Sequence, residues 1–467
     1  MTEAVSPGGP IAAPAPVDGL QAPAFSTAPP FSRAYTRYAM WLLLGIYVIN
    51  FLDRQVINIL AEPIKQDLGL ADWQLGLMSG LAFAVFYTVL GIPIARLAER
   101  RNRAIIIGSA TALWSGFTAL CATAGNFWQL IAYRIGVGVG EAGCTPPAHS
   151  LIVDYTPKEK RASALAFYAM GTPIGSLLGL MMGGVIADAY GWRTAFLVAG
   201  APGVVFALLA VFTLKEPRRM MRQHADKLAA ASATFSQTVA YLMKRRTFWL
   251  IAFAAAIKAF IGYGHAPFTA SFFLRNHGPE VQDLASSIGM TLGYDLKSVG
   301  FLGLVLGFMS GTAGAIGSLT GGWIADRYGR RDLRAYMVAP AIASLITIPI
   351  LIVALTVDSA ATALLILPIN YFLATLWYGP VYGTAQSVVP PHMRATAAAI
   401  LLFIINLIGL GLGPLAVGLL SDGFNRGLGL GAADGVRWAL IVSTLFGMVA
   451  FACFWTARRT IREDTVS

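Results

Sequence analysis

The fold is decided by GGWIADRYGRRD, residues 321–332, because a related stretch, ARLAERRNRA, occurs at residues 95–104. Each stretch follows the second of six apolar segments in its half of the chain, and each places basic residues after an acidic one. The two stretches align in register at Ala95 and Gly322, Glu99 and Asp326, Arg100 and Arg327, Asn102 and Gly329, and Arg103 and Arg330. Two copies at equivalent positions indicate an internal duplication.

Long apolar segments recur on both sides of these loops. Of the 467 residues, 56% are hydrophobic and 12% are charged, which is too apolar for a soluble protein with a charged surface. A helix needs about 20 apolar residues to cross the ~30 Å hydrocarbon core of a bilayer. Windows of this kind fall near 38–60, 74–95, 104–124, 127–153, 161–186, 194–214, 247–274, 298–325, 334–356, 360–389, 395–421 and 437–457.

These windows predict an all-α integral membrane protein with twelve transmembrane helices in two pseudo-symmetric six-helix bundles. The stretch between the bundles is polar and strongly basic, which suits a cytoplasmic linker or a lateral helix. The first residues are rich in Pro and Ala and contain neither a signal peptide nor a transit peptide, so we expect a disordered tail. The predicted boundaries are 1–36 for this tail, 37–214 for the first bundle, 215–246 for the linker, 247–458 for the second bundle and 459–467 for a cytoplasmic tail.

Charge predicts how the chain is oriented. The net charge is +11, but the Lys and Arg residues lie in short clusters between apolar segments and form no basic domain, so we expect no nucleic-acid partner. Most of these clusters fall on the side of the membrane that holds the N-terminus. By the positive-inside rule, both termini are then cytoplasmic, and we expect a multi-pass protein of the inner cell membrane that works as a monomer.

Nothing in the sequence indicates a cofactor, a metal site or an enzyme. The G-x-G-x-x-G spacing at Gly138, Gly140 and Gly143 lacks a preceding strand, so it is better read as a small-residue stripe for helix packing, as are the glycines spaced by four from Gly171 to Gly179. No P-loop and no HExxH spacing occurs. Three cysteines lie inside apolar segments without CxxC spacing: Cys121, Cys144 and Cys453.

The pattern G-x-x-x-D-R-x-G-R-R, complete at residues 322–331, resembles the signature loop of the major facilitator superfamily. The first copy departs from it at Ala95, Glu99 and Asn102. The resemblance implies that each loop latches one conformation, with its carboxylate held by basic groups and a helix N-terminus. A plain positive-inside loop is the alternative. The implied latch residues are Glu99, Arg100, Arg103, Asp326, Arg327, Arg330 and Arg331.

A finer resemblance, to the spinster-like branch of that superfamily, covers most of the first half. It is carried by NFLDR at 50–54, RIGVGVGEAGCTPPAHSLIVDY at 134–155, PKEKRASALAFYAMGTPIGSLLG at 157–179 and DAYGWRTAFLVAG at 188–200. The second half supports only the superfamily. This resemblance implies proton-coupled movement of lysophospholipids or sphingolipid-type amphiphiles.

Four ionisable residues lie inside the predicted spans of the first half. Such groups cost roughly 2.5–3.5 kcal/mol each on insertion scales, so they tend to face a cavity and to pair. Asp53 and Arg54 are neighbours in one helix, whereas Arg134 and Glu141 are seven residues apart and share a helix face. We predict that Asp53 and Glu141 carry protons, and that the arginines hold these acids or an anionic head group, with Arg134 mainly neutralising Glu141. Static salt bridges between the helices are the alternative.

The seventh predicted helix carries three further candidates for substrate binding or charge pairing: Lys258, Tyr263 and His265. His265 could titrate near neutral pH, or it could be a hydrogen-bonded packing residue. Lys258 could contact substrate or extend to the interface. Gly262, Gly264 and Pro267 should break or bend this helix.

Together these features predict a secondary active transporter that works by alternating access and moves an amphiphilic lipid in exchange with, or together with, protons. Three alternatives remain open: a proton-coupled transporter of small organic anions or other small molecules, a membrane-embedded enzyme, and a sensor that binds without transport. The expected partners are the substrate, protons and membrane lipid.

Overall fold

The computed structural model describes residues 31–157, 160–217, 235–329 and 331–466. Within these ranges every regular element is a helix, and ten segments are long and apolar enough to cross a membrane. The prediction of an all-helical membrane protein is therefore confirmed. Residues 1–30 of the predicted N-terminal tail and residues 218–234 of the predicted linker lie outside the described residues. The last residues of the predicted tail, 33–36, are helical, because α1 begins at Arg33.

The N-terminal half forms the helices α1 to α8. Their bounds are α1 Arg33–Leu68, α2 Asp72–Ser79, α3 Leu81–Arg100, α4 Arg103–Cys121, α5 Phe127–Glu141, α6 Thr145–Tyr155, α7 Arg161–Ala169 and α8 Gly171–Thr213. Within α8 the chain breaks helical geometry at Gly191, whose φ of 83° is accessible at low cost only to glycine. The segment labelled α8 is therefore two helices joined at a sharp turn.

The C-terminal half contains α10 to α20 with short 3₁₀ and π-helical pieces. Their bounds are α10 Phe235–Met243, α11 Arg246–Asn276, α12 Gly278–Leu292, α13 Ser298–Gly329, α14 Ala335–Thr356, α15 Ala360–Thr375, α16 Tyr378–Ser387, η3 Pro391–Met393, α17 Arg394–Ile404, η4 Ile405–Leu412, α18 Gly413–Asp422, η5 Gly423–Gly427, α19 Gly431–Leu445 and α20 Gly447–Asp464. The expected break near Pro267 does not occur, because α11 continues through this residue to Asn276.

Local sequence explains where several of these helices begin and end. Ser32 caps α1 by accepting a hydrogen bond from the Tyr35 amide at 3.2 Å, and Gly69 ends that helix in the left-handed conformation. Asn102 caps α4 by accepting from the Ala104 amide at 2.9 Å.

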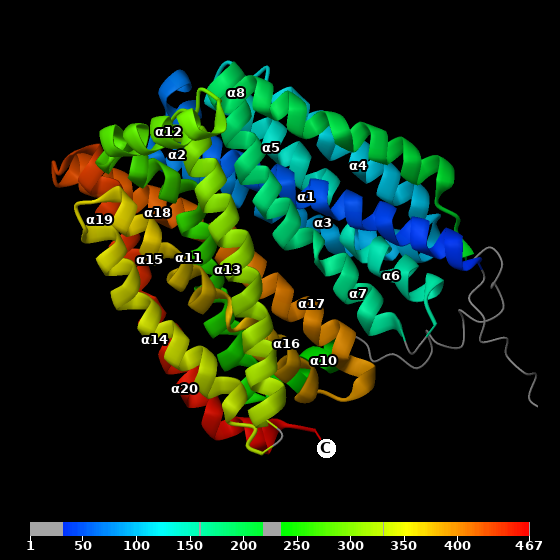
Figure 1. Ribbon diagram of the computed structural model, residues 1–467. Coiled ribbons are helices and arrows are strands. Elements are labelled where there is room, and N and C mark those ends of the chain that lie inside the picture. The colour runs from blue at the N-terminus through cyan, green and yellow to red at the C-terminus, as the bar shows by residue number, and fades with distance from the viewer. Residues whose placement is uncertain (1–30, 158–159, 218–234, 330, 467) are drawn as a thin grey trace, which may run out of the picture.

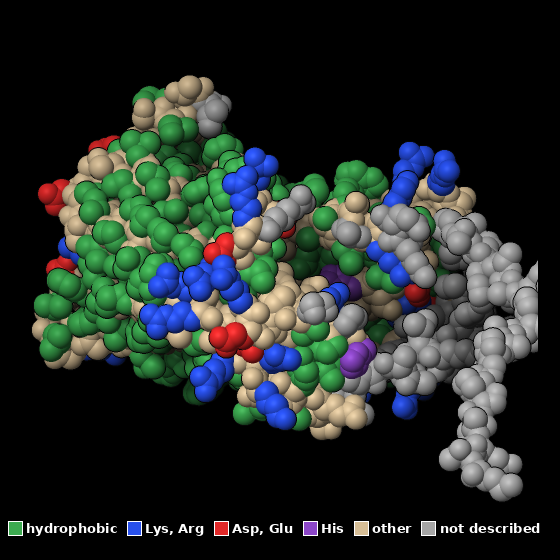
Figure 2. All heavy atoms as spheres, turned by 90° about the horizontal axis from the view of Figure 1, so that it is seen from below, with side chains coloured by type: hydrophobic (Ala, Val, Ile, Leu, Met, Phe, Trp, Pro, Cys, Tyr) green, Lys and Arg blue, Asp and Glu red, His purple; other side chains and the backbone are tan. Residues whose placement is uncertain are grey.

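The two halves meet at one end of the molecule and diverge toward the other (Figure 1). We call the end that carries α2 and α12 the closed end, and the end that carries α6, α7 and α10 the open end. Viewed from the open end, the surface is hollowed between the halves, with Lys and Arg side chains around the hollow (Figure 2).

Glycines allow the close approach of the halves near the closed end. A Cβ added at Gly76 of α2 would lie 2.1 Å from the Pro414 carbonyl oxygen of α18, and one at Gly303 of α13 would lie 2.4 Å from the Leu180 carbonyl oxygen of α8. The predicted stripe in α8 packs in the same way on α1, where a Cβ at Gly175 would lie 2.3 Å from the Val48 carbonyl oxygen. Larger residues would force these backbones apart.

Candidate functional site

Two ion pairs join α1 to α5 in the interior of the N-terminal half. Arg54 Nε donates to Glu141 Oε2 at 2.5 Å, and Arg134 Nη1 lies 3.7 Å from Asp53 Oδ2. Both carboxylates and the Arg134 side chain are almost fully buried. The structure therefore brings together all four charged residues that the sequence predicted for this half.

The partners differ in one respect from our expectation, because Arg134 pairs with Asp53 and not with Glu141. Asp53 and Arg54 are consecutive residues in α1, so their side chains leave the helix about 100° apart and meet different partners. Arg134 and Glu141 share one face of α5, but they are two turns apart.

In each of the two carboxylates, of Asp53 and of Glu141, one oxygen accepts a hydrogen bond and the other does not. Asp53 Oδ1 accepts from the Thr118 hydroxyl at 2.8 Å, while Asp53 Oδ2 and Glu141 Oε1 are buried and accept no hydrogen bond from the described residues. The two carboxyl groups lie within electrostatic range of each other and of both arginines. The four charges thus form one interacting cluster, which we call the charge cluster.

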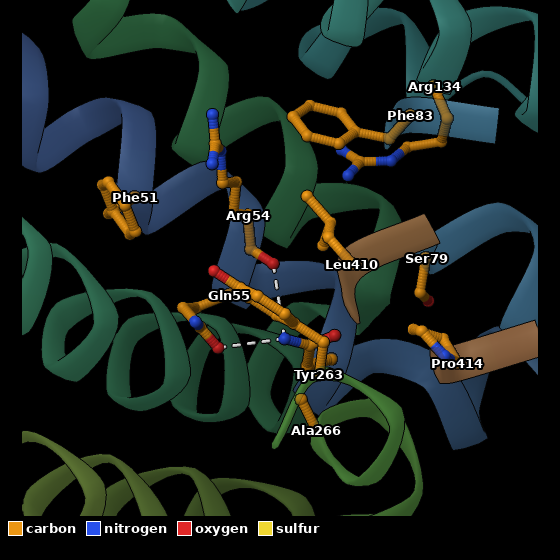
Figure 3. A pocket seen from close by; sticks show the side chains of 11 residues that line it. Phe51, Arg54, Gln55, Ser79, Phe83, Arg134, Tyr263, Ala266, Leu410 and Pro414 are labelled. Carbon is orange, nitrogen blue, oxygen red and sulfur yellow. Dashed lines mark hydrogen bonds between the residues drawn. The ribbon is translucent and has the colours of Figure 1, made fainter. Parts of the chain in front are cut away.

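A pocket lies beside the charge cluster, between the two halves (Figure 3). Arg54 and Arg134 contribute the charge, Ser79 contributes a hydroxyl group, and most of the remaining lining is aromatic or aliphatic. The C-terminal half supplies its side from α11, η4 and α18. The lining residues are Phe51, Arg54, Gln55, Asn58, Ser79, Phe83, Arg134, Tyr263, Ala266, Leu410 and Pro414.

Aromatic rings surround the Arg54 guanidinium group. Its central carbon lies 4.4 Å from the Tyr87 ring centroid, 4.9 Å from that of Phe83 and 5.1 Å from that of Phe51, and Arg134 lies 5.5 Å from the same Phe83 ring. Such rings stabilise a partly desolvated cation without neutralising it. Arg54 is therefore held by both the Glu141 carboxylate and the aromatic rings, at the edge of the pocket.

The candidates on α11 divide into two groups. Tyr263 lines the pocket and lies within electrostatic range of Arg54. His265 instead hydrogen bonds the Ser443 hydroxyl of α19 at 2.8 Å, and neither it nor Lys258 lines the pocket. Lys258 is 6% exposed and lies near His265 on the same helix face. Of the three, only Tyr263 faces the pocket.

The predicted latch residues lie at the open end and behave differently from one another. Arg330 and the side chain of Glu99 fall outside the described part of the structure. Arg103 is completely buried, where it forms ion pairs with Glu216 and, at 2.7 Å, with Asp154. Four others are exposed, and within the described ranges they form no ion pair: Arg100, Asp326, Arg327 and Arg331.

A second charged cluster, which the sequence did not reveal, joins the halves at the closed end. Arg275 of α11 donates to Glu62 of α1 at 2.6 Å and to Asp72 of α2 at 2.8 Å, while Lys65 donates to Asp72 at 2.6 Å. Ser421 of α18 donates to the same Asp72 at 2.6 Å. Glu62 and Arg275 are more than 200 residues apart in the sequence, so no local spacing could identify this pairing.

Two carboxylates also cap helices across the halves at this end. Asp188 of α8 accepts hydrogen bonds from the Lys297 amide at 3.0 Å and the Gly300 amide at 2.7 Å, at the start of α13. Asp422 of α18 accepts one from the Trp73 amide at 2.8 Å, at the start of α2. Each half thus caps a helix of the other half.

Comparisons with known proteins agree on one family. Residues 43–414 match the Major Facilitator Superfamily. The chain is 31% identical over 437 residues to an MFS-type efflux pump of Mycolicibacterium smegmatis, covering 93% of this chain and 95% of the pump. It is 26% identical over 432 residues to protein spinster homolog 1 of Xenopus tropicalis, covering 91% of this chain and 80% of that protein. It is 24% identical over 398 residues to a hexuronate transporter of Bacillus subtilis, covering 84% of this chain and 89% of that transporter.

Solved structures show the same relationship. The fold matches the inward-facing, unoccupied crystal structure of a bacterial homolog of the human lysosomal transporter Spinster, with a TM-score of 0.82 and 31% identity over 94% of this chain and 100% of the other. The inward-facing, occupied structure of a bacterial homolog matches with a TM-score of 0.79, at the same identity and coverage.

Proposed function

This chain belongs to the major facilitator superfamily, in its spinster-like branch, and on that premise we propose that it is a proton-coupled secondary transporter of an amphiphilic lipid. The substrate class that we propose is a lysophospholipid or a sphingolipid-like molecule with an anionic head group. The observation that carries this proposal is the buried charge cluster beside a pocket whose remaining wall is largely aromatic and aliphatic.

We further propose twelve spans in two six-helix bundles. The ten apolar segments support this count because one of them, Ser163–Thr213, contains the turn at Gly191 and so provides two spans. The consecutive helices α5 and α6, which are outside those ten segments, provide another. Residues 37–214 and 247–458 are the proposed bundles, joined by the linker at 215–246.

The open end is proposed to face the cytoplasm. Lys and Arg side chains surround the hollow at that end, as the positive-inside rule requires (Figure 2). In this orientation both termini are cytoplasmic, the chain lies in the inner membrane, and the structure is an inward-facing state. The exposed latch residues at the open end fit this state, because a cytoplasmic latch would be released in it.

Roles follow from the geometry of the charge cluster. The anionic head group would bind Arg54 or Arg134 through charge-assisted hydrogen bonds, and the acyl chain would lie against Phe51, Phe83 and Leu410. Asp53 and Glu141 would bind the coupling proton, since buried carboxylates beside arginines respond strongly to any change of local charge. Alternating access would expose this site to each side in turn.

A transporter of small organic anions is the second candidate. The hexuronate transporter of Bacillus subtilis supports it, because the similarity covers most of this chain and a hexuronate is an anion. Two arginines in one pocket would serve such a substrate equally well, and the aromatic wall would then have only a packing role. The two candidates differ in whether the substrate has an apolar tail.

The test is flux into proteoliposomes that contain the purified protein, measured for labelled lysophosphatidic acid, sphingosine phosphate and a hexuronate. We expect both lipids to move faster under a pH gradient, with the response abolished in Asp53→Asn and Glu141→Gln. Asp67→Asn is the matched control, because Asp67 is a carboxylate of α1 in an exposed pair with Arg193. Hexuronate flux without lipid flux would make small organic anions the substrates.

A further inference from the structure

One buried hydroxyl group in the pocket has no hydrogen-bond partner. Ser79 is the last residue of α2, lines the pocket and is only 7% exposed. Its Oγ atom is buried and forms no hydrogen bond with any described residue. Because a buried polar group without a partner is costly, such a group in a binding pocket indicates that a ligand atom satisfies it.

Several other buried hydroxyl groups of the long helices are satisfied within their own helix. Thr111, Ser271 and Ser344 each donate to the carbonyl oxygen four residues earlier, at 2.7 Å, 3.4 Å and 2.7 Å. Ser79 forms no such bond. Among the buried serine and threonine hydroxyl groups that lack a partner in the described part of the chain, only that of Ser79 lines the pocket (Figure 3).

The backbone around Ser79 lies where the two halves approach most closely. Gly80 interrupts the helix between α2 and α3, with φ −111° and ψ −91°. Hydrogen bonds of helical type still cross this position, from the Gly80 amide to the Gly76 carbonyl at 3.0 Å and from the Ala84 amide to the Gly80 carbonyl at 2.9 Å. A Cβ atom at Gly80 would lie 2.8 Å from the Gly411 carbonyl oxygen of η4. The C-terminal half therefore covers this side of the pocket in the present state.

Ser79 lies about one helical turn, ~5.4 Å, from the residue that contacts both arginines of the pocket. Phe83 is four residues after Ser79, and its ring centroid is 4.9 Å from the Arg54 guanidinium carbon and 5.5 Å from that of Arg134. Arg134 Nε and Nη1 donate no hydrogen bond to the described residues, so donors for an anionic group are already present. Ser79 is thus available for a neutral group of the same ligand.

A serine hydroxyl group both donates and accepts, which makes it complementary to another hydroxyl group. We propose that Ser79 hydrogen bonds a hydroxyl group that the substrate carries a few bonds away from its anionic group. The glycerol hydroxyl of a lysophospholipid and the chain hydroxyl of a sphingoid phosphate are placed in this way. The inference rests on the proposed lipid substrate and adds a residue that selects among amphiphilic anions.

The test compares lysophosphatidic acid with its deoxy analogue, in which a hydrogen atom replaces the glycerol hydroxyl group. Equilibrium binding of both lipids to the purified protein gives the ratio of their affinities. We expect the native protein to bind lysophosphatidic acid roughly tenfold more tightly, the effect of one buried hydrogen bond. Ser79→Ala should bind the two lipids equally, whereas Ser79→Thr, which keeps the hydroxyl group, should retain the preference.

Ser344→Ala is the matched control, because Ser344 is a buried helical serine that does not line the pocket. It should keep the native ratio. A general loss of stability would weaken both lipids alike, so only a change in the ratio supports the proposed contact.

Three results would overturn the role of Ser79 while leaving the lipid substrate in place. The native protein could bind both lipids equally, the preference could survive in Ser79→Ala, or Ser79→Ala could weaken both lipids by the same factor, which would place Ser79 against the phosphate. Absence of binding of either lipid to the native protein would instead contradict the proposed lipid substrate, and the selection by Ser79 would be overturned with it.

Discussion

Among single residues, Arg54 is central to the proposed site, because it pairs with Glu141 and lies against three aromatic rings. A guanidinium group can donate to Glu141 and still present donors to a head group, whereas an ammonium group is a point charge without that geometry. The side chain of Arg54 is 11% exposed, so its loss is not compensated by water.

Arg54→Lys should reduce lipid flux roughly tenfold to hundredfold, since hydrogen bonds to charged groups contribute about 1.5–3 kcal/mol. Arg193→Lys, in an exposed ion pair with Asp67, is the matched control and should change flux little. Initial rates in proteoliposomes measure both variants. Equal rates for Arg54→Lys and the native protein would exclude Arg54 from the site.

His265, in contrast to Arg54, is expected to have no part in transport or its pH dependence. It hydrogen bonds Ser443 and does not line the pocket, so His265→Asn, which keeps a hydrogen-bonding group, should leave the pH profile of transport unchanged. The measurement is flux against pH for the native and variant proteins. A displaced profile would show that His265 takes part in coupling and that the packing interpretation is wrong.

Sequence identified Asp53, Arg54, Arg134 and Glu141 because charged residues inside apolar segments are conspicuous. It could not give their pairing, which depends on the rotation of α1 relative to α5. It also missed Asp72 and Arg275, because each lies at the end of a helix where charged residues are ordinary. Their partners become visible only when α2, α11 and α18 meet at the closed end.

At the scale of elements, Asp188 and Asp422 each cap a helix of the opposite half. These caps exist only while the closed end is closed, because opening it would separate each carboxylate from its helix. A side-chain cap contributes ~1 kcal/mol. Asp188→Ala and Asp422→Ala should each shift the equilibrium roughly fivefold toward the state that is open at this end.

The shift can be measured as a distance between spin labels at Tyr190 and Met290, which are exposed on α8 and α12. The labels require a background in which the three native cysteines are replaced. The fraction of long distances should increase in both alanine variants. Glu280→Ala is the control, because Glu280 caps α15 within its own half and its loss should leave the distance distribution unchanged.

Glu280 has its own expected effect, on stability. Backbone amides of Ala360 and Ala361 and the Ser359 hydroxyl hydrogen bond its carboxylate and lower the pKa of Glu280 below the ordinary value. Since the pKa is depressed on folding, the contribution is complete above the unfolded pKa of about 4.3 and is lost as pH falls through the folded value.

Glu280→Gln should therefore lower the melting temperature in detergent at neutral pH, with a loss of ~1 kcal/mol. The difference between the two proteins should become smaller in acid. Melting curves at neutral pH and near pH 3 provide the measurement. A difference that grows as the pH falls would contradict the assigned direction.

Element positions were predicted well where a hydrophobic span had the length of the membrane, and poorly where it did not. The amphipathic helix α12, Gly278–Leu292, falls between two predicted windows, because its polar face hides it from a search for apolar segments. The helix α1 extends beyond its window at both ends, since its terminal residues are polar but still helical. Pro267 did not break α11, because a helix packed on its neighbours can retain a proline.

At the scale of the whole molecule, closure at one end and a hollow at the other fit one state of an alternating-access cycle (Figures 1 and 2). Arg275, Glu62 and Asp72 join the halves at the closed end, while the exposed latch residues mark the open end. The proposed cycle exchanges these roles: the closed-end contacts break and the latch forms. The charge cluster lies between the closed-end contacts and the latch residues, and we propose that it couples the cycle to protons.

The most direct test of the central claim is whether the substrate moves protons. Lysophosphatidic acid is added outside proteoliposomes with no pH gradient imposed, and the internal pH is followed with a trapped dye. We expect a change of internal pH that requires the protein, follows lipid uptake and disappears in Glu141→Gln. Lipid uptake without any change of internal pH would contradict proton coupling.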